Sequence, residues 1–533
     1  MPIESTYPPV AVPPVDLWTL VFQRTDREFP EEHVLYVELT TQRRLTFRAI
    51  QQAAEAFGRG LLQQWDWQRG DKLALMTPNT ADVAPVTFGA WFAGGVVCPV
   101  NHQHKAGELV SLLRTSQAKA LITDLSCLKV ACKAASAVGL PLGKILLVGD
   151  HDPERRFQHF SSFQGPSSIN RVRNKPSDLC FLVFSSGTTG PPKAVMLTHE
   201  NIVANIIQFS TVDAGVFNWK TDRVLGIASL VLSPLYQGIT IYIMTEFDLE
   251  AFCGAIQKEK ITYAAIVPPV AVALAKSPVV GKYDLSSLRM LLSAAAPAGN
   301  DLIEAIYERL KVPLKQNYGL TEASPLVSAQ RWEDWNKPIG SSGRLVPSIS
   351  MKIMSDEKEV GQGREGEIWI KGPNVTKGYY NNPKATAESI DDEGWYRTGD
   401  IGYVDEKNNI YITDRLKELI KYNGFQVAPA ELEGLLLAHP AVSDVAVIGV
   451  YSEQRATELP RAVVVLADGY KGDEKMEKGL KDWIHERVAP YKRLRGGVRF
   501  AQTIPKSNAG KLLRRVLVEE ARRDNEKAPT ARL

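Results

Sequence analysis

The stretch Leu179 to Lys193 reads LCFLVFSSGTTGPPK and joins a short apolar run to a polar loop rich in glycine and hydroxyl side chains. The apolar part, Leu179 to Phe184, predicts a buried strand. The loop, Ser185 to Lys193, then emerges at the carboxyl end of that strand, which is the edge where open α/β sheets bind ligands. The stretch therefore indicates an α/β fold with a ligand site directly after this strand.

The loop has the composition that a polyphosphate needs. Gly187 and Gly190 permit positive φ and close approach of the backbone, while Lys193 supplies a positive charge. The hydroxyl donors are Ser185, Ser186, Thr188 and Thr189. The loop is not a Walker A motif, because Pro192 and Ala194 stand where that motif requires a glycine before the lysine and a hydroxyl after it. A flexible Ser/Gly surface turn is the alternative interpretation of this loop taken alone.

Composition sets outer limits on the fold and the partners. The 533 residues are too many for one ordinary core, and 44% hydrophobic with 23% charged residues is typical of globular protein. The 63 basic and 60 acidic residues leave a net charge of +3, which gives no basis for nucleic acid as a dominant partner. Five scattered cysteines without ligand spacing argue against a disulfide framework or zinc site and favour a reducing compartment.

Two segments bear on membranes and targeting. The longest uncharged stretch, residues 83–100, is broken by prolines and glycines, so we expect a buried helix and strand and no transmembrane segment. The N-terminus shows no secretory signal. The C-terminal Ala531-Arg532-Leu533 is a variant of the SKL peroxisomal address, read by an import receptor, although three such residues also arise by chance. A peroxisomal location is expected, with a cytoplasmic one as the alternative.

The chain divides after Asp414. Before it, apolar runs alternate with helical patterns, for example residues 195–197 followed by Thr198 as a helix N-cap. After it come a charged connector, a helix opened by Pro429, two apolar strands and an amphipathic helix around residues 476–488. We expect residues 1–414 to form a large domain of layered α/β subdomains, and residues 415–533 a small α/β domain.

Five motifs occur in a fixed order along almost the whole chain: FSSGTTGPPK, QNYGLTE, GWYRTGD, DRLKELIKYNGFQVAPAELE and PKSNAGK. Together they resemble the acyl-adenylate-forming superfamily of acyl-CoA synthetases and luciferases, and within it the 4-coumarate-CoA ligase-like branch. The resemblance implies a large AMP-binding domain and a small mobile domain. It also implies ATP, Mg²⁺ and coenzyme A (CoA) as cofactors or co-substrates.

The resemblance assigns nucleotide-binding roles in the large domain. Tyr318 stacks on adenine, Thr321 binds the α-phosphate, and Glu322 holds Mg²⁺, a hard cation that favours oxygen ligands. Asp400 accepts bonds from both ribose hydroxyls, supported by Arg415. The segment Ala294, Ala295, Ala296 and Pro297 matches the adenine wall, with alanine at its first position where glycine is usual.

In the small domain the resemblance assigns catalysis. Lys511 reaches the substrate carboxylate and the α-phosphate, where a cation offsets the repulsion between two anions. Lys417 is the hinge about which the domain turns after pyrophosphate leaves. Gly424, with Lys421 and Gln426 beside the nucleotide, then forms the surface where the CoA thiol attacks. Without the neighbouring motifs, residues 415–421 are typical of a solvated connector.

One stretch departs from the family pattern. Relatives carry an LPFFHIYG-like segment that lines the acyl pocket, whereas this chain passes from Gly226 directly to Ile227-Ala228-Ser229. Three explanations are open: an error in deriving the sequence, a repacked pocket, or a chain that binds nucleotide without turnover. We favour the first because the flanks fit the family. A real deletion shortens a core strand and the helix after it.

The sequence thus predicts an ATP-dependent ligase that converts a carboxylic acid, either aromatic and phenylpropanoid or medium-chain, to acyl-AMP and then to its CoA thioester. One alternative is adenylation for another acceptor. The other is a non-catalytic nucleotide-binding protein, because the acyl-pocket segment is missing.

Overall fold

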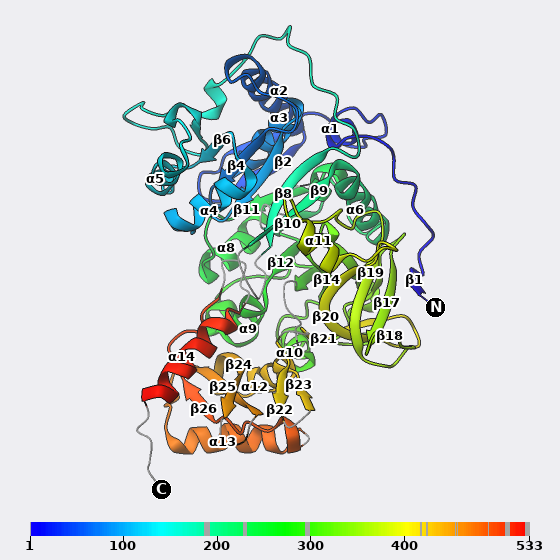
Figure 1. Ribbon diagram of the computed structural model, residues 1–533, viewed down its shortest axis with the longest axis vertical. Helices are drawn as coiled ribbons and strands as arrows, with labels where there is room; N and C mark the ends of the chain where they lie inside the picture. Colours follow the sequence, from blue (N-terminus) through cyan, green and yellow to red (C-terminus); the bar gives the residue numbers. More distant parts are fainter. Residues whose placement is uncertain are drawn as a thin grey trace.

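The computed structural model describes residues 2–185, 192–226, 232–293, 299–415, 418–422, 425–452, 455, 457–488, 490–506 and 512–527. Figure 1 shows a large part, coloured blue to yellow, and a small C-terminal domain in orange and red. Within the described residues, the strands of the large part form three sheets. Two of these are α/β layers and one is antiparallel, so the expected architecture is confirmed.

The strands are grouped by sheet as follows. The first α/β sheet has the order β7 (Ile145–Leu147), β6 (Ala120–Thr123), β4 (Lys72–Met76), β5 (Val96–Val100), β8 (Leu179–Ser185) and β9 (Lys193–Thr198). The second has the order β16 (Arg344–Leu345), β15 (Leu326–Ala329), β14 (Leu314–Gly319), β13 (Met290–Ser293), β12 (Tyr263–Ile266), β10 (Arg223–Gly226), β11 (Thr240–Ile243), β2 (Val34–Glu38) and β3 (Arg44–Thr46). The antiparallel sheet contains β1 (Ile3–Glu4), β17 (Ser350–Ser355), β18 (Lys358–Glu359), β19 (Gly366–Lys371), β20 (Tyr396–Val404) and β21 (Ile410–Arg415).

Helices cover both α/β sheets. Those of the large part are α1 (Leu17–Phe22), α2 (Phe47–Gln64), α3 (Val83–Phe92), α4 (Ala106–Ser116), α5 (Leu128–Val138), α6 (His199–Val212), α7 (Leu232–Gln237), α8 (Leu249–Glu259), α9 (Pro268–Lys276), α10 (Asn300–Leu310) and α11 (Pro383–Ser389). Residues 83–100 form helix α3 and strand β5, as predicted, and the described helices include none with the length and apolarity needed to span a bilayer. Thr198 caps α6, accepting from the amide of Asn201.

The predicted strand before the glycine-rich loop is confirmed, but the loop is shorter than expected. Ser185 is the last residue of β8 and Lys193 is the first residue of β9, and the two are register partners in an antiparallel pair. Backbone pairing therefore extends to both ends of the predicted loop. β8 itself runs parallel to β5, so its carboxyl end faces the same edge as the ends of β4 and β5.

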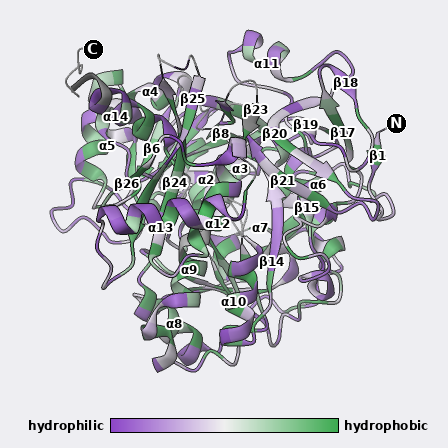
Figure 2. Cartoon of the chain, turned by 90° about the horizontal axis from the view of Figure 1, so that it is seen from below, coloured by the Kyte–Doolittle hydropathy of each residue, from purple (hydrophilic) through white to green (hydrophobic). Residues whose placement is uncertain are grey.

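The core of the large part needs close helix packing. A Cβ on Gly58 of α2 would lie 2.7 Å from the carbonyl oxygen of Gly89 on α3, so a larger residue at either helix surface would force the helices apart. Trp91 and Phe88 are fully buried in the same cluster. Figure 2 shows interior strands largely hydrophobic and α13 (Glu474–His485) largely hydrophilic where it faces outward.

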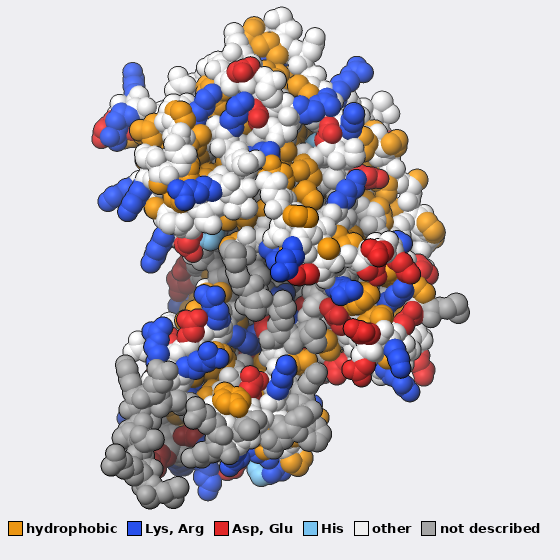
Figure 3. Space-filling model, in the orientation of Figure 1, with side chains coloured by type: hydrophobic (Ala, Val, Ile, Leu, Met, Phe, Trp, Pro, Cys, Tyr) orange, Lys and Arg blue, Asp and Glu red, His pale blue; other side chains and the backbone are white. Residues whose placement is uncertain are grey.

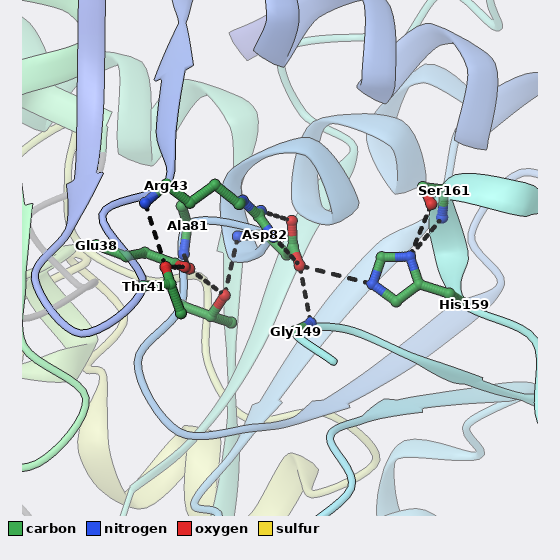
Figure 4. Close-up of polar contacts among 9 residues, drawn as sticks. Glu38, Thr41, Arg43, Ala81, Asp82, Gly149, His159 and Ser161 are labelled. Carbon is green, nitrogen blue, oxygen red and sulfur yellow. Dashed lines mark hydrogen bonds and ion pairs between the residues drawn. The ribbon is translucent and has the colours of Figure 1, made fainter. Parts of the chain in front are cut away.

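A polar network joins the two α/β sheets (Figure 4). Glu38, at the end of β2, accepts hydrogen bonds from Thr41 at 2.7 Å and from the Ala81 amide at 2.8 Å. Burial alone would raise the pKa of Glu38, but these bonds, with one from Thr80, lower it. The carboxylate thus holds the loop after β4 against the β2–β3 hairpin.

Asp82, buried beside this carboxylate, continues the network. It pairs with Arg43 and accepts from the Gly149 amide at 2.8 Å. Its Oδ2 also lies 3.8 Å from Nε2 of His159, whose Nδ1 faces the Ser161 hydroxyl at 2.7 Å. Because these residues come from separate segments, the network fixes the two subdomains relative to each other (Figure 4).

Charges of both signs lie on the face drawn in Figure 3, where acidic side chains gather in the region of β17 and β18. The β17–β18 turn contains the exposed Asp356 and Glu357, and β18 ends at the exposed Glu359. The acidic patch therefore lies on the antiparallel sheet.

The small domain contains the hairpin β22 (Ile420–Tyr422) and β23 (Phe425–Val427), the sheet β24 (Val442–Ser452), β25 (Thr457–Leu466) and β26 (Val498–Phe500), and helices α12 (Pro429–Leu437), α13 and α14 (Arg514–Lys527). Pro429 opens α12 as predicted. β21 ends at Arg415, one residue beyond the expected boundary at Asp414. Arg415 therefore belongs to the antiparallel sheet of the large part.

Lys276, at the end of α9, reaches from the large part to the small domain. Its ammonium donates to the carbonyl oxygens of Leu437 and Val442, both at 2.9 Å. Leu437 is the last residue of α12, where a cation satisfies acceptors that the helix leaves free, and Val442 begins β24. The contact fixes the small domain in the orientation seen in Figure 1.

β10 ends at Gly226 and is held between β11 and β12, and α7 begins at Leu232. The shortening of a core strand and helix that the missing segment implies stays a prediction, because both elements border residues outside the described part of the chain. Residues 227–231 lie outside the described residues.

Candidate nucleotide site

Lys193, the first residue of β9, lies close to an aromatic ring. Its ammonium lies 4.9 Å from the ring centroid of Tyr379. The backbone beside Tyr379 pairs with β9, because the Tyr380 amide donates to the Ala194 carbonyl at 2.8 Å. The lysine predicted from the loop is therefore positioned by a segment almost two hundred residues further along the chain.

Tyr379 links this lysine to the predicted metal ligand. Its hydroxyl donates to Oε1 of Glu322 at 3.1 Å and lies 3.0 Å from the hydroxyl of Tyr396. Glu322 sits on the short 3-10 helix Thr321–Ala323 and is buried. Burial and the neighbouring carboxylate raise the pKa of Tyr379 to about 12, so its hydroxyl keeps its proton and donates. The two tyrosines fix the direction of the Glu322 carboxylate.

Asp400 lies at the centre of a second group of polar side chains. Its Oδ2 accepts from the Tyr318 hydroxyl at 2.7 Å, and its Oδ1 lies 3.1 Å from Nε of Arg415. Asp400 and Arg415 are register partners on β20 and β21. Burial and the Asp400 charge raise the pKa of Tyr318 well above its ordinary value. Tyr318 is therefore a neutral donor, and Asp400 has oriented oxygens suited to hydroxyl ligands.

The two groups share the same elements. Tyr318 lies on β14 and Glu322 follows that strand, while Tyr396 and Asp400 both lie on β20. Thr321, which is half-buried, lies between Tyr318 and Glu322 in the sequence. The structure thus brings the predicted residues Tyr318, Glu322, Asp400 and Arg415 to one junction between the second α/β sheet and the antiparallel sheet.

Several predicted site residues lie outside the described residues. They are Ser186, Gly187, Thr188, Thr189, Gly190, Ala294, Ala295, Ala296, Pro297, Lys417, Gly424, Lys511 and the C-terminal Ala531, Arg532 and Leu533. Their assignments stay predictions from the sequence.

Lys421 and Gln426 are register partners in the β22–β23 hairpin of the small domain. Lys421 is exposed, and its amide donates to Oε2 of Glu458 at 2.8 Å. The hydroxyl of Thr457 donates to the Lys421 carbonyl at 2.8 Å. The hairpin that carries both residues is thus anchored to β25.

Sequence reasoning missed Tyr379 and Tyr396 as members of the site. Tyr396 lies inside the GWYRTGD motif, two residues before its threonine, so the motif itself marked the position. Tyr379 follows Gly378 outside every motif, and no local signal separates it from its neighbour Tyr380. Only the pairing of this segment with β9 shows which tyrosine faces Glu322.

Asp414 is the missed ionisable group beside the predicted hinge. It accepts from the Ala430 amide of α12 at 3.2 Å. Burial, together with the nearby Glu418, raises the pKa of Asp414 to about 7, although Arg514 and backbone donors oppose this. The end of β21 thus meets the small domain through a carboxyl group that titrates near neutrality.

Comparison with known proteins places this geometry in a family. Residues 22–380 match the family model described as AMP-binding enzyme, and residues 431–511 match the AMP-binding enzyme C-terminal domain. "Probable 4-coumarate--CoA ligase 3" of Dictyostelium discoideum is 37% identical over 541 residues, which cover 96% of each chain. "4-coumarate--CoA ligase 1" of Petroselinum crispum is 38% identical over 471 residues, 84% of each chain.

Solved structures of related enzymes have the same fold as this chain. The anthranilate CoA ligase AuaEII, in complex with anthranoyl-AMP, superimposes with a TM-score of 0.86 at 23% identity, covering 97% of this chain and 99% of that one. That likeness shows the fold. The o-succinylbenzoate CoA synthetase of Bacillus subtilis, in complex with its acyl-adenylate intermediate, gives a TM-score of 0.78 at 25% identity, covering 95% and 98%.

Proposed function

This chain belongs to the AMP-binding enzyme family and is an AMP-forming acid–thiol ligase, and we propose that its acid is aromatic, of the phenylpropanoid type. The support for that acid comes from the relatives, which are named as 4-coumarate-CoA ligases and are 37% and 38% identical over most of both chains. A medium-chain acid is the other substrate class consistent with the sequence.

The reaction has two balanced steps. The substrate carboxylate attacks the α-phosphorus of ATP, forming acyl-AMP and releasing pyrophosphate. The CoA thiol then attacks the acyl carbon, forming the thioester and releasing AMP and a proton. The Asp400 carboxylate, fixed by Tyr318 and Arg415, is the observation that carries the nucleotide site, because its oxygens can accept the two ribose hydroxyls.

Glu322 is the residue that we propose for Mg²⁺. Its carboxylate is buried and held by Tyr379, beside the strand end that carries Lys193. Mg²⁺ in nucleotide sites is typically bound by one or two carboxylates together with phosphate oxygens and water, so this single oriented carboxylate fits. Among the described residues, no three His, Cys, Asp or Glu side chains form a metal cage. The ion would neutralise phosphate charge.

The small domain supplies the remaining groups. We assign Lys511 to the first step, where its ammonium offsets the repulsion between carboxylate and α-phosphate. Lys421 and Gln426, carried together on the β22–β23 hairpin with Gly424 between them, are assigned to the thioester step after the domain turns about Lys417. One hairpin therefore carries both assigned residues.

The test is acid-dependent release of pyrophosphate from ATP by the purified chain with Mg²⁺. The acids are 4-coumarate, anthranilate, o-succinylbenzoate and medium-chain fatty acids, each with and without CoA. We expect release and thioester with 4-coumarate, loss of both in Lys511→Ala, and retention in Arg515→Ala.

Other outcomes decide between the alternatives. Preference for a fatty acid would move the substrate to the medium-chain class. Release of pyrophosphate with no thioester would indicate another acceptor. ATP binding without release for any acid would indicate that the short segment after Gly226 has removed turnover.

We also propose that Ala531-Arg532-Leu533 directs the protein to peroxisomes through the import receptor for such tails. A fluorescent protein carrying the last twelve residues should co-localise with a peroxisomal marker. Deleting the three residues should leave it in the cytosol, while Arg532→Lys should keep it in peroxisomes. Cytosolic fluorescence from the intact tail would contradict this location.

A further inference from the structure

The residues on either side of the stretch 507–511, which contains Lys511, are paired with each other. Lys506 and Leu512 form an isolated antiparallel bridge, and the Leu513 amide donates to the Pro505 carbonyl at 2.9 Å. The chain therefore leaves and returns at one fixed place on the small domain.

An ion pair anchors the chain on the N-terminal side of residues 507–511. Nζ of Lys506 lies 2.6 Å from Oδ2 of Asp444 on β24, and both side chains are partly buried. A pair at this distance between partly desolvated groups is a charge-assisted hydrogen bond, which is stronger than a neutral one. It ties the chain before Lys511 to the central sheet of the small domain.

Arg514 anchors the chain on the C-terminal side of residues 507–511 through more contacts. Its Nη2 bonds both carboxylate oxygens of Glu433 on α12, at 2.7 and 2.8 Å. Its Nη1 pairs with Glu418, next to the hinge residue, and its Nε donates to the Val447 carbonyl at 3.2 Å. All three nitrogens of the guanidinium are therefore engaged, by residues on three different segments.

The charges around Arg514 make it the shared counter-ion of this region. Glu433 and Glu418 are both largely buried, and Asp414 at the end of β21 also interacts with the guanidinium. Three carboxyl groups thus converge on one cation. Removing that cation leaves buried carboxylates without their partner, which costs more than the loss of an exposed ion pair.

We propose that Arg514 is a positioning residue for acyl-adenylate formation: it fixes the chain that directly follows Lys511 in sequence to α12 and to Glu418 beside the hinge. The proposal rests on the proposed function, in which Lys511 serves the first step and is withdrawn from the second. A cation that meets two anions in a transition state depends on its placement, and a displacement of about 1 Å can lower a rate roughly a hundredfold.

The test separates the two half-reactions. In Arg514→Ala, acid-dependent pyrophosphate release should fall roughly a hundredfold. Conversion of supplied acyl-adenylate to thioester by CoA should stay close to the wild-type rate. Arg514→Lys should show an intermediate loss, because an ammonium is a point charge that cannot match the bidentate carboxylate. The matched control is Arg515→Ala, whose side chain is 73% exposed and, within the described part of the chain, pairs with Glu519 on its own helix.

Two further measurements guard against a variant that merely fails to fold. Glu418→Gln keeps the bidentate Glu433 pair and should still depress the first half-reaction more than the second. Hydrogen exchange at the Leu513 amide should accelerate in Arg514→Ala but not in Arg515→Ala, and this readout needs no substrate.

Equal losses in both half-reactions, or unchanged Leu513 exchange, would overturn the positioning role. A wild-type chain that releases no pyrophosphate with any acid would instead overturn the proposed function. Faster exchange in Arg514→Ala would then still support the anchoring of this segment.

Discussion

The hydroxyl of Tyr318 donates a 2.7 Å hydrogen bond to Oδ2 of Asp400, a residue 82 positions further along the chain. The bond joins β14 to β20, and Arg415 engages the other carboxylate oxygen at 3.1 Å. The carboxylate is consequently oriented by side chains from two other strands, β14 and β21.

Replacing Tyr318 by phenylalanine keeps the ring and removes this bond. Because hydrogen bonds to charged groups stabilise folded proteins by about 2 kcal/mol, the free energy of unfolding should fall by about that amount in urea denaturation. The matched control is Tyr411→Phe, whose hydroxyl lies 3.4 Å from Asp405. Equal losses in the two variants would refute the special strength of the Tyr318 bond.

Tyr379→Phe removes the donor to Glu322 while keeping the ring beside Lys193. A less well oriented carboxylate should bind Mg²⁺ more weakly, so half-maximal pyrophosphate release should need several times more Mg²⁺. The neighbouring Tyr380→Phe removes a hydroxyl that contacts Gln117, and should leave the Mg²⁺ titration unchanged. An unshifted titration in Tyr379→Phe would show that Glu322 does not depend on this tyrosine.

Asp414 predicts a pH dependence of stability. Its pKa of about 7 in the folded chain lies above the ordinary 3.8, so in this range the folded state retains a proton that the unfolded state loses. The contribution of this group to the free energy of unfolding is therefore largest below the ordinary pKa. It falls as pH rises and no longer changes above about pH 7.

Between pH 5 and pH 8 the wild type should lose roughly 3 kcal/mol relative to Asp414→Asn in urea unfolding. Asp405→Asn is the control, because hydrogen bonds from Asn409 lower the pKa of Asp405 against the effect of burial. Its curve should run parallel to the wild type over this range. A pH-independent difference between wild type and Asp414→Asn would exclude a raised pKa.

Lys276→Met should loosen the contact between the large part and the small domain. The methionine keeps the stem of the side chain but loses the bonds to Leu437 and Val442. We expect faster initial tryptic cleavage between residues 415 and 421. Lys282→Met, at an exposed lysine 3.8 Å from Glu250, should cleave at the wild-type rate, and equal rates in both variants would argue against the contact.

The elements that the sequence predicted are those determined locally. The apolar run before the glycine-rich loop became β8, Thr198 capped α6, and Pro429 opened α12. Periodicity, capping and proline geometry act over a few residues, so a pattern along the chain is enough to find them. The ordered motifs likewise assign Tyr318, Glu322, Asp400 and Arg415 to one site, and in the fold these residues lie at one junction.

The sequence alone thus determined the family, the order of the elements and which residue types the nucleotide site needs. The tertiary structure decided the long-range contacts. Tyr379, and not Tyr380, donates to Glu322, Arg514 pairs with Glu418 and Glu433, and Lys276 donates to the end of α12. These contacts join residues far apart in the chain. They depend on strand register and domain packing, which bring side chains together without leaving any periodic trace in the sequence.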